Sequence, residues 1–271
     1  MAKNNEMSFL GHLEVLRWHL VRAFAAIFIF TIIAFVSKDI IFDDIIFGPK
    51  QPDFFTYRML CNLSKFFGMD GAGMCMDEMP FVVQNRTMAG QFTSHLWVSF
   101  IAGFIIAFPY IMWEMWRFLK PGLTIKERSY TNGVVFVSTV LFMLGILFGY
   151  YLIAPLSINF LGGYRVSDEI LNEIDLSSYI STVSTVTLSS GVVFELPIIV
   201  YFLAKIDLLT PDMMRSYRRH SFVGVLVLSA IITPPDISSQ ILVSIPIMIL
   251  YELSIYIAAF VVKQNKKKEI E

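Results

Sequence analysis

Charge, cysteine and histidine are all scarce in this chain of 271 residues. Charged side chains make up 16% of the sequence, against roughly 25% in soluble domains. The net charge is −1, and a chain without a basic excess cannot neutralise a run of phosphates, so no nucleic-acid partner is expected. Hydrophobic residues make up 56%, Phe alone occurs 25 times, and the mean hydropathy is +0.65. This composition predicts a membrane protein rather than soluble domains.

Motifs of catalysis and nucleotide binding are also missing. The sequence contains no HExxH, GxSxG, Walker A or GxGxxG pattern, and its four His are scattered. We therefore predict a protein that is not an enzyme and that uses no cofactor and no metal. An ATP-driven pump or an intramembrane protease finds no support.

The two cysteines, Cys61 and Cys75, lie in one polar segment and form no CxxC pair. In an oxidising compartment outside the membrane they could form a disulfide. Two free thiols in a loop are an equally good interpretation. A zinc site is not expected, because no His or further Cys lies near them.

Six hydrophobic segments predict membrane-spanning helices, each of which needs about 20 apolar residues. We expect them at residues 20–36, 92–118, 132–154, 179–204, 221–233 and 237–262. The stretches 37–91 and 156–178 are predicted as external loops. The fifth segment covers only about 20 Å at 1.5 Å per residue, so it must thin the bilayer or lie behind longer neighbours.

The distribution of basic residues predicts the orientation. Fifteen of the 21 Lys and Arg fall in the segments that would share a side with both ends of the chain. The positive-inside rule then places both termini in the cytoplasm. We expect one integral-membrane domain over residues 1–271, in an all-α polytopic fold of six transmembrane helices.

Ionisable side chains inside membrane spans are costly and therefore candidates for function. Glu195 is the clearest, two residues before Pro197 in the fourth span; the alternative is an interhelical hydrogen bond. Glu252 could instead reach the membrane surface, and Gln240 could equally well hydrogen-bond between helices. Glu114 is interpreted as an ordinary interfacial charge.

Two cytoplasmic carboxylates could take an arginine guanidinium bidentately. Glu127 lies in the basic segment between the second and third spans, and Glu14 lies in a predicted interfacial helix before the first span. On spacing alone, local salt bridges explain both, because Arg17 is three residues after Glu14 and Glu127 has basic neighbours.

Five short motifs, in order along nearly the whole chain, resemble the TatC family, the core subunit of the twin-arginine protein translocase. The matching pieces are His12–Arg17; Phe108–Tyr110 with Trp116–Phe118; Pro121–Leu123 with Glu127–Arg128; Phe194–Pro197; and Thr233–Gln240 with Ile245–Pro246.

This resemblance implies a function and a set of sites. The family binds twin-arginine signal peptides of folded cargo proteins, recruits single-span partner subunits of the TatA/TatB type, and is driven by the proton-motive force. It implies self-association, a bacterial inner-membrane location and a bundle concave on one face. The implied signal-peptide site is Glu127, Phe118, Glu14 and Arg17. The implied intramembrane groove and partner contacts are Glu195, Gln240, Pro49 and Asp236.

One departure concerns the N-terminal motif. The family usually has its second arginine-binding glutamate one residue after Glu14, where this chain has Val15. On a helix the two positions differ by about 100°. Either Glu14 substitutes, or the chain depends more on Glu127, or the residue at this position has been altered. His19 also replaces a common arginine.

Other classes of function are less well supported. A secondary transporter of ions or small molecules could use Glu195 and Glu252 as proton relays, but such transporters commonly show two related halves. A membrane enzyme would need a nucleophile or metal set, and a scaffold would not need a buried glutamate beside a proline.

Overall fold

A computed structural model describes residues 9–66, 81–120, 131–167, 169, 172–233 and 237–270. The chain divides into two compact units, which we describe separately. The first unit is Met1–Lys38 with His95–Val140, and the second unit is Asp39–Ser94 with Leu141–Glu271.

The first unit is built on three helices, two of which continue into the second unit. They are α1 (Phe9–Val36), α3 (Gly90–Leu119) and α5 (Thr131–Phe148). α1 begins well before residue 20, because no proline or helix break separates the polar N-terminal segment from the hydrophobic one. The predicted interfacial helix and the first predicted span are therefore one continuous helix.

α1 and α3 approach each other closely at a glycine. A Cβ atom added at Gly103 would lie only 2.6 Å from the backbone nitrogen of Thr31 and 2.8 Å from its Cα. Nearer the C-terminal end of α1, the His95 ring stacks on Phe35 with ring centroids 4.0 Å apart. The His95 Nε2 lies 3.0 Å from the Phe35 carbonyl oxygen. Close packing and a side-chain contact therefore join the two helices.

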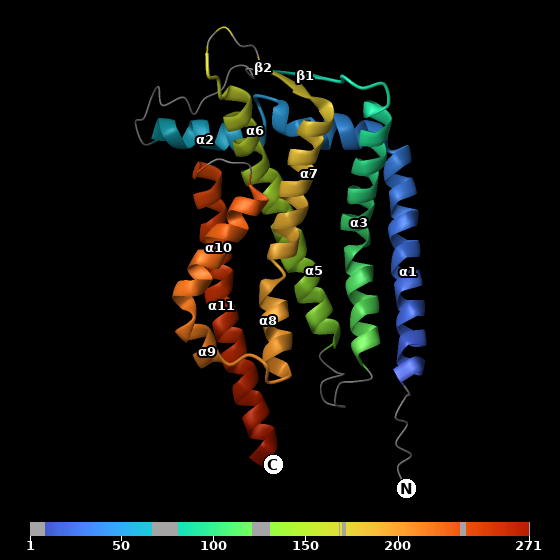
Figure 1. Ribbon diagram of the computed structural model, residues 1–271, viewed down its shortest axis with the longest axis vertical. Helices are drawn as coiled ribbons and strands as arrows, with labels where there is room; N and C mark the ends of the chain where they lie inside the picture. The colour runs from blue at the N-terminus through green and yellow to red at the C-terminus, as the bar shows by residue number, and fades with distance from the viewer. Residues whose placement is uncertain are drawn as a thin grey trace. The chain divides into compact units, whose positions relative to one another are not determined.

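The second unit holds most of the elements. Its helical segments are η1 (Ile40–Ile46), η2 (Gly48–Lys50), α2 (Phe55–Phe66), η4 (Gly149–Ile153), α6 (Ala154–Gly163), α7 (Leu176–Val193), α8 (Leu196–Lys205), α9 (Pro211–Ser216), α10 (Arg218–Ile232) and α11 (Ile237–Ile270). Its strands are β1 (Phe81–Gln84) and β2 (Asn172–Asp175). Figure 1 shows α10 beside α11, and the two helices are in contact.

The third predicted span does not end at Pro155. The helix continues from α5 through the π-helical turn η4 into α6, which ends at Gly163. Pro155 lies in the first turn of α6, directly after the π-helical turn, where the regular hydrogen-bond spacing of the α-helix is already interrupted. The helix is therefore longer than the predicted span and covers the first residues of the segment predicted as an external loop.

Glycines allow this long helix to pack against α7. A Cβ atom at Gly145 would lie 2.6 Å from the Ser190 carbonyl oxygen, and one at Gly149 would lie 2.9 Å from the Thr187 Cα. Gly191 on α7 faces back toward Ile146. Small residues four apart commonly bring helices close together in membranes. The Gly145-x-x-x-Gly149 spacing was a sequence signal that our sequence analysis did not use.

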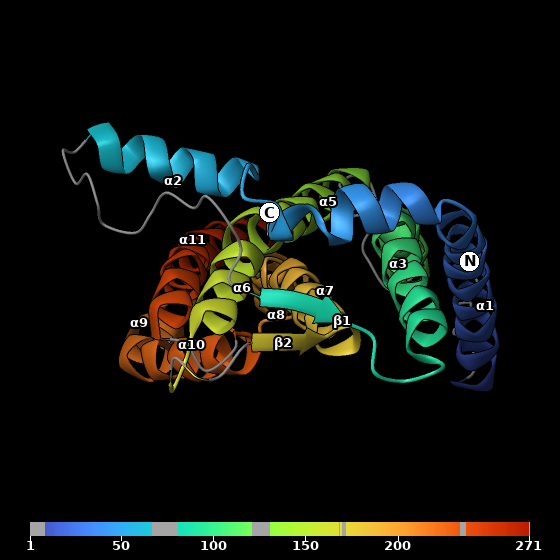
Figure 2. The ribbon, with the colours of Figure 1, turned by 90° about the horizontal axis from the view of Figure 1, so that it is seen from above.

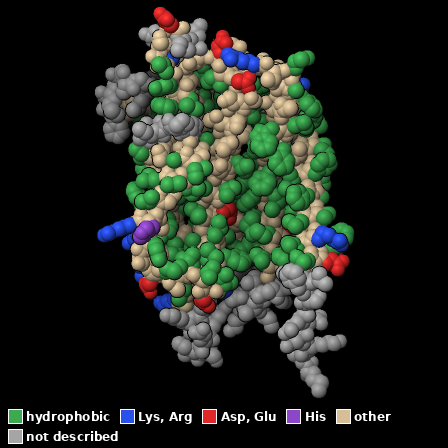
Figure 3. Space-filling model, viewed as in Figure 1, with side chains coloured by type: hydrophobic (Ala, Val, Ile, Leu, Met, Phe, Trp, Pro, Cys, Tyr) green, Lys and Arg blue, Asp and Glu red, His purple; other side chains and the backbone are tan. Residues whose placement is uncertain are grey.

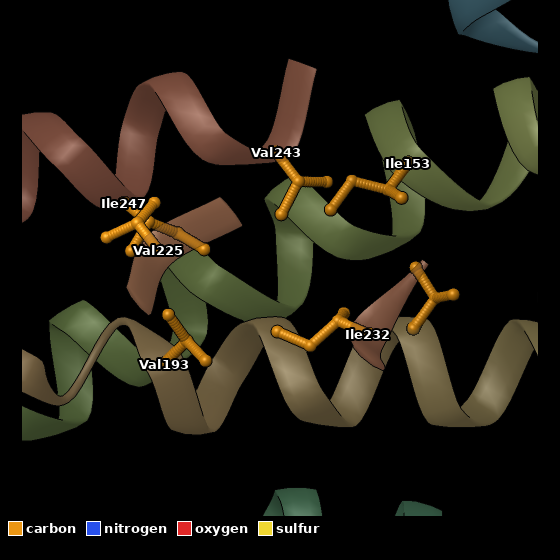
Figure 4. Packing of buried hydrophobic residues seen from close by; sticks show 7 residues of the cluster. Ile153, Val193, Val225, Ile232, Val243 and Ile247 are labelled. Carbon is orange, nitrogen blue, oxygen red and sulfur yellow. The ribbon is translucent and has the colours of Figure 1, made fainter. Parts of the chain in front are cut away.

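A hydrophobic cluster packs four helical segments of the second unit together. Its buried members come from η4, α7, α10 and α11 (Figure 4): Ile153, Val186, Val193, Val225, Ile232, Val243 and Ile247. Aliphatic side chains from four separate segments therefore share one core.

Five helical stretches are long and apolar enough to cross a membrane. They are Leu13–Val36, Gly90–Leu119, Gly133–Gly163, Leu176–Lys205 and Ser239–Lys263. In Figure 3 hydrophobic side chains cover the helices, and charged side chains gather mainly near the helix ends. The described chain is therefore mostly helical, as predicted, and has the composition of a multi-pass membrane protein. α10, at the fifth predicted span, is a helix of 15 residues.

A two-stranded sheet lies outside the all-α prediction. β1 and β2 pair in parallel, with Phe81 opposite Asn172 and Gln84 opposite Asp175 (Figure 2). The Asn172 side chain donates to the carbonyl oxygens of Gly162 and Tyr164, and Arg86 forms a 3.0 Å ion pair with Glu173. Strands of four residues carry too little alternation to be recognised from sequence.

Candidate functional site

A buried carboxylate lies at the end of α3 in the first unit. Glu114 is 1% exposed. Its Oε2 atom is hydrogen-bonded to Nδ1 of His19 on α1, and its Oε1 accepts a 3.1 Å hydrogen bond from the Tyr110 hydroxyl. A buried charge is costly unless it is paired and hydrogen-bonded, and here both carboxylate oxygens have a partner.

Two arginines complete what we call the Glu114 cluster, namely His19, Arg22, Tyr110, Glu114 and Arg117. The guanidinium of Arg22 lies 3.6 Å from the carboxylate, and that of Arg117 lies 3.7 Å from it. Both arginine side chains are about half exposed. The cluster thus joins α1 to α3 through one buried acid and several donors.

Helix periodicity explains why these five side chains meet. Tyr110 and Arg117 lie four residues before and three residues after Glu114, so the three share one face of α3. His19 and Arg22 are three residues apart and share a face of α1. The interpretation of Glu114 as an ordinary interfacial charge was wrong, because the acid is buried between two helices. The spacing of a Tyr, an acid and an Arg on one face was the signal that could have identified it.

Phe118 lies next to this cluster. Its ring is edge-on to the His19 ring, with centroids 5.9 Å apart. His19 therefore contacts both Glu114 and Phe118. Of the four residues predicted for the signal-peptide site, Phe118 is thus anchored to α1 through His19.

Glu14 and Arg17 lie earlier on α1 and pair with each other. Their charged groups are 3.7 Å apart, and the side chains are 68% and 65% exposed. The Arg17 guanidinium also lies over the Trp18 ring, 5.6 Å from its centroid. Such an exposed pair is held weakly, so Glu14 remains accessible to another cation.

Glu195 lies at a break between two helices of the second unit. It is buried, and it separates α7 from α8. Pro197, in the first turn of α8, lacks the N–H that a continuous helix would need at this point. The backbone N–H groups of Ile198 and Ile199 instead turn to the Glu195 carbonyl oxygen, at 2.9 and 3.1 Å. The sequence predicted an acid in the middle of a span. The structure adds that this acid lies where α7 ends and α8 begins.

Two other predicted groove residues, Gln240 and Pro49, make hydrogen-bonded contacts within the second unit. Gln240 donates a 3.1 Å hydrogen bond from Nε2 to the Leu226 carbonyl oxygen, so it links α11 to α10. Pro49 is buried, and its carbonyl oxygen accepts a 3.0 Å hydrogen bond from Tyr57. These contacts give both residues a structural role, and a groove shared with Glu195 stays a prediction.

Glu252 on α11 pairs with Arg218 on α10, with 2.6 Å between the charged atoms. Glu252 also lines a groove of about 400 Å³ along α10 and α11, whose lining includes Phe222, Met248 and Tyr256. The lining is almost entirely apolar, so this groove suits a hydrophobic occupant.

Removing the ion pair between Arg218 and Glu252 by substitution is expected to lower the stability of the protein only slightly. The two side chains are 49% and 34% exposed, so water screens the pair and its coupling should be at most about 1 kcal/mol. Melting midpoints of Arg218→Ala, Glu252→Gln and the double variant would give this coupling. A coupling above roughly 3 kcal/mol would mean that the pair is cut off from water.

Three predicted residues lie outside the described part of the chain. They are Glu127, Asp236 and Cys75. The arginine-receiving role of Glu127 and the disulfide between Cys61 and Cys75 therefore stay predictions. Within the described residues, no group of three or more His, Cys, Asp and Glu could hold a metal ion.

Long apolar helices and polar side chains buried at helix contacts define a multi-pass membrane protein. Residues 11–246 match the family described as TatC, Sec-independent protein translocase protein. The chain belongs to this family, and it is a transport protein, a component of the twin-arginine protein translocase.

Relatives and solved structures agree with this placement. The TatC protein of Blattabacterium sp. subsp. Periplaneta americana is 44% identical over 97% of this chain and 99% of its own length. That of Desulforapulum autotrophicum is 33% identical over 100% of this chain and 92% of its own. A crystal structure of the twin-arginine translocase receptor TatC in DDM has a TM-score of 0.70 at 30% identity, covering 91% of this chain and 99% of that one.

Proposed function

We propose that this protein is the core translocase subunit that binds twin-arginine signal peptides of folded proteins and nucleates a complex driven by the proton-motive force. The observation that carries the proposal is the Glu114 cluster. His19 of this cluster contacts Phe118 near the C-terminal end of α3 and so ties this end of α3 to α1. In the sequence of this TatC-family chain, the segment that follows α3 carries Glu127. A rigid anchor at this end of α3 would present the loop carboxylate to its ligand.

In this proposal Glu127 receives an arginine of the signal peptide, and Phe118 packs beside it. A carboxylate and a planar guanidinium form two parallel hydrogen bonds, which lysine cannot reproduce. Glu14 takes the place of the glutamate that is absent at Val15. Its weak, exposed pairing with Arg17 supports this role, because an incoming guanidinium could replace Arg17 at little cost.

Partner subunits would bind on the second unit. We propose that single-span subunits of the TatA/TatB type contact the protein near Glu195, Gln240, Pro49 and Asp236, and that copies of the protein associate. The apolar groove along α10 and α11 supports a hydrophobic helix as the occupant. The buried Glu195 beside a helix break supports a polar contact at membrane depth.

The proposed membrane arrangement has six spans, with both termini in the cytoplasm of a bacterium and the chain in the inner membrane as a single domain, concave on one face. Five of the spans are the long apolar stretches, and α10 is the remaining, short one, fifth in chain order. Its 15 residues reach about 22 Å at 1.5 Å each, less than the roughly 30 Å of hydrocarbon. The bias of Lys and Arg toward the same side supports the orientation.

Signal-peptide binding can be tested with the purified protein in nanodiscs. A labelled peptide with Arg-Arg should bind more tightly than its Lys-Lys twin. Glu127→Ala should weaken Arg-Arg binding about ten- to a hundredfold, since a hydrogen bond to a charged group contributes about 1.5–3 kcal/mol. The dissociation constants, measured by fluorescence anisotropy, report both effects.

Two further variants make this experiment specific. Glu14→Ala should also weaken binding, whereas Glu169→Ala, an exposed acid between α6 and β2, should leave it unchanged. An equal affinity for both peptides, or a preference that survives Glu127→Ala together with Glu14→Ala, would remove the receptor assignment.

A further inference from the structure

The external helix α2 has three distinct faces. Its buried face carries Thr56, Tyr57 and Ser64. A second face carries the exposed basic side chains Arg58 and Lys65, and the exposed Asn62 lies between this face and the third. The third carries four large apolar side chains, Phe55, Met59, Leu63 and Phe66, which are between 42% and 83% exposed. At 100° per residue these four fall within about 80° of the helix circumference, so they form one continuous stripe.

The buried face of α2 is held firmly to the second unit. The Tyr57 hydroxyl lies 3.0 Å from the Pro49 carbonyl oxygen and 2.8 Å from that of Pro155. The Thr56 hydroxyl is hydrogen-bonded to the Tyr151 carbonyl oxygen. The apolar stripe is therefore not needed to pack α2 against the second unit, because Thr56 and Tyr57 on a different face make these contacts.

The apolar stripe begins at a membrane-spanning surface. The ring of Phe55 is edge-on to that of Tyr151, with centroids 6.0 Å apart. Tyr151 is 40% exposed and lies within the candidate span Gly133–Gly163. The apolar surface of this span therefore continues onto α2 without a polar interruption at this contact.

The direction of α2 fits the surface of a bilayer. In Figure 1 α2 lies across the direction of α7 and α11, at the end of the second unit where β1 and β2 lie. Figure 2 shows it extending away from α10 and α11. A helix that lies across the spans, at their ends, would run along the membrane surface.

We propose that α2 is an interfacial anchor whose apolar stripe inserts into the outer leaflet of the bilayer. The charges favour lipid as the occupant. Arg58 and Lys65 border the stripe, where their long side chains can keep the cationic groups among lipid phosphates while the apolar side chains enter the acyl region. The inference depends on the membrane arrangement and is independent of signal-peptide binding.

Photo-crosslinking at neighbouring positions tests this. The full-length protein would carry p-benzoylphenylalanine in place of Met59 or of Arg58, in vesicles of phosphatidylethanolamine and phosphatidylglycerol with a clickable acyl chain. These positions are adjacent in the chain, but Met59 lies near the middle of the stripe and Arg58 lies about 100° away from it around the helix. Lipid adducts should form at Met59 several-fold more than at Arg58, and probes at Phe66 and Lys65 should repeat the contrast.

Several results would overturn the anchor. Equal lipid labelling at Met59 and Arg58 would show that the stripe does not enter the bilayer. Adducts to protein at Met59 in native membranes, in place of lipid adducts, would assign the stripe to a protein partner. Because the Leu63 side chain is exposed, Leu63→Asp should leave the melting midpoint unchanged but reduce lipid labelling from a probe at Met59. Unreduced labelling would contradict the proposal.

Discussion

Replacing Glu114 by alanine is expected to destabilise the first unit by about 3–5 kcal/mol. The acid is buried, and removing one partner of a buried ionic cluster leaves the others without their counter-charge. His19 would lose a hydrogen-bonding partner, and α1 would lose its polar link to α3. The midpoint of thermal unfolding in detergent micelles should fall well below that of the wild type.

Two further variants, Glu114→Gln and Glu14→Ala, test whether the loss of stability comes from the burial of the Glu114 charge. Glu114→Gln keeps the shape and can still accept from Tyr110, so it should lose less stability than Glu114→Ala. Glu14→Ala removes an acid from the same pair of helices, but one that is 68% exposed, and its melting midpoint should match that of the wild type. If Glu14→Ala were as damaging as Glu114→Ala, burial would not be the source of the effect.

Replacing Gly145 by alanine is expected to cost about 2–3 kcal/mol. The new methyl group would lie 2.6 Å from the Ser190 carbonyl oxygen and 2.8 Å from the Gly191 Cα, which are backbone atoms that cannot rotate away. α5 and α7 must then separate, and overpacking of this kind typically costs about 1–3 kcal/mol. A fall of roughly 4–12 °C in the melting midpoint is the expected readout.

A second glycine provides the matched control. Gly224 is also inside a helix, but a Cβ atom added there would meet nothing within 4 Å. Gly224→Ala should therefore leave the melting midpoint unchanged or raise it slightly, because alanine favours a helix over glycine. A similar loss in both variants would attribute the effect to helix flexibility and would remove the close approach as its cause.

The close α5–α7 contact also bears on Glu195. Gly145 packs against Ser190, Gly191 and Phe194, which immediately precede the break at Glu195. The Phe194 ring in turn packs on Phe148, with centroids 5.5 Å apart. The position of the buried acid therefore depends on glycines that lie some fifty residues earlier in the chain.

Hydrophobic runs alone were sufficient to predict most helices. The segments at 92–118 and 237–262 correspond to α3 and to most of α11, because a spanning helix is defined by its length and composition, which are local properties. The short helix near 221–233 was also found, as α10. The family could be recognised for a similar reason, since its motifs are short strings of adjacent residues.

Contacts between distant segments could not be predicted from the same patterns. Nothing in the sequence near Glu114 shows that His19, 95 residues away, meets its carboxylate. The pairing of β1 with β2 joins two loops whose own sequences show no strand pattern. Such pairings depend on which helix faces meet, and hydrophobic periodicity does not specify the partner of a face.

The sequence by itself determined that this protein is a mostly helical membrane protein of the TatC family, because composition and short motifs are written in consecutive residues. Only the tertiary structure decided that Glu114 is buried, that Phe118 packs on His19, and that the apolar stripe of α2 is left exposed. The physical reason is that the burial and the pairing of a side chain depend on a second segment that is distant in the sequence. The role of a polar or apolar side chain is therefore set only when that segment covers it or leaves it exposed.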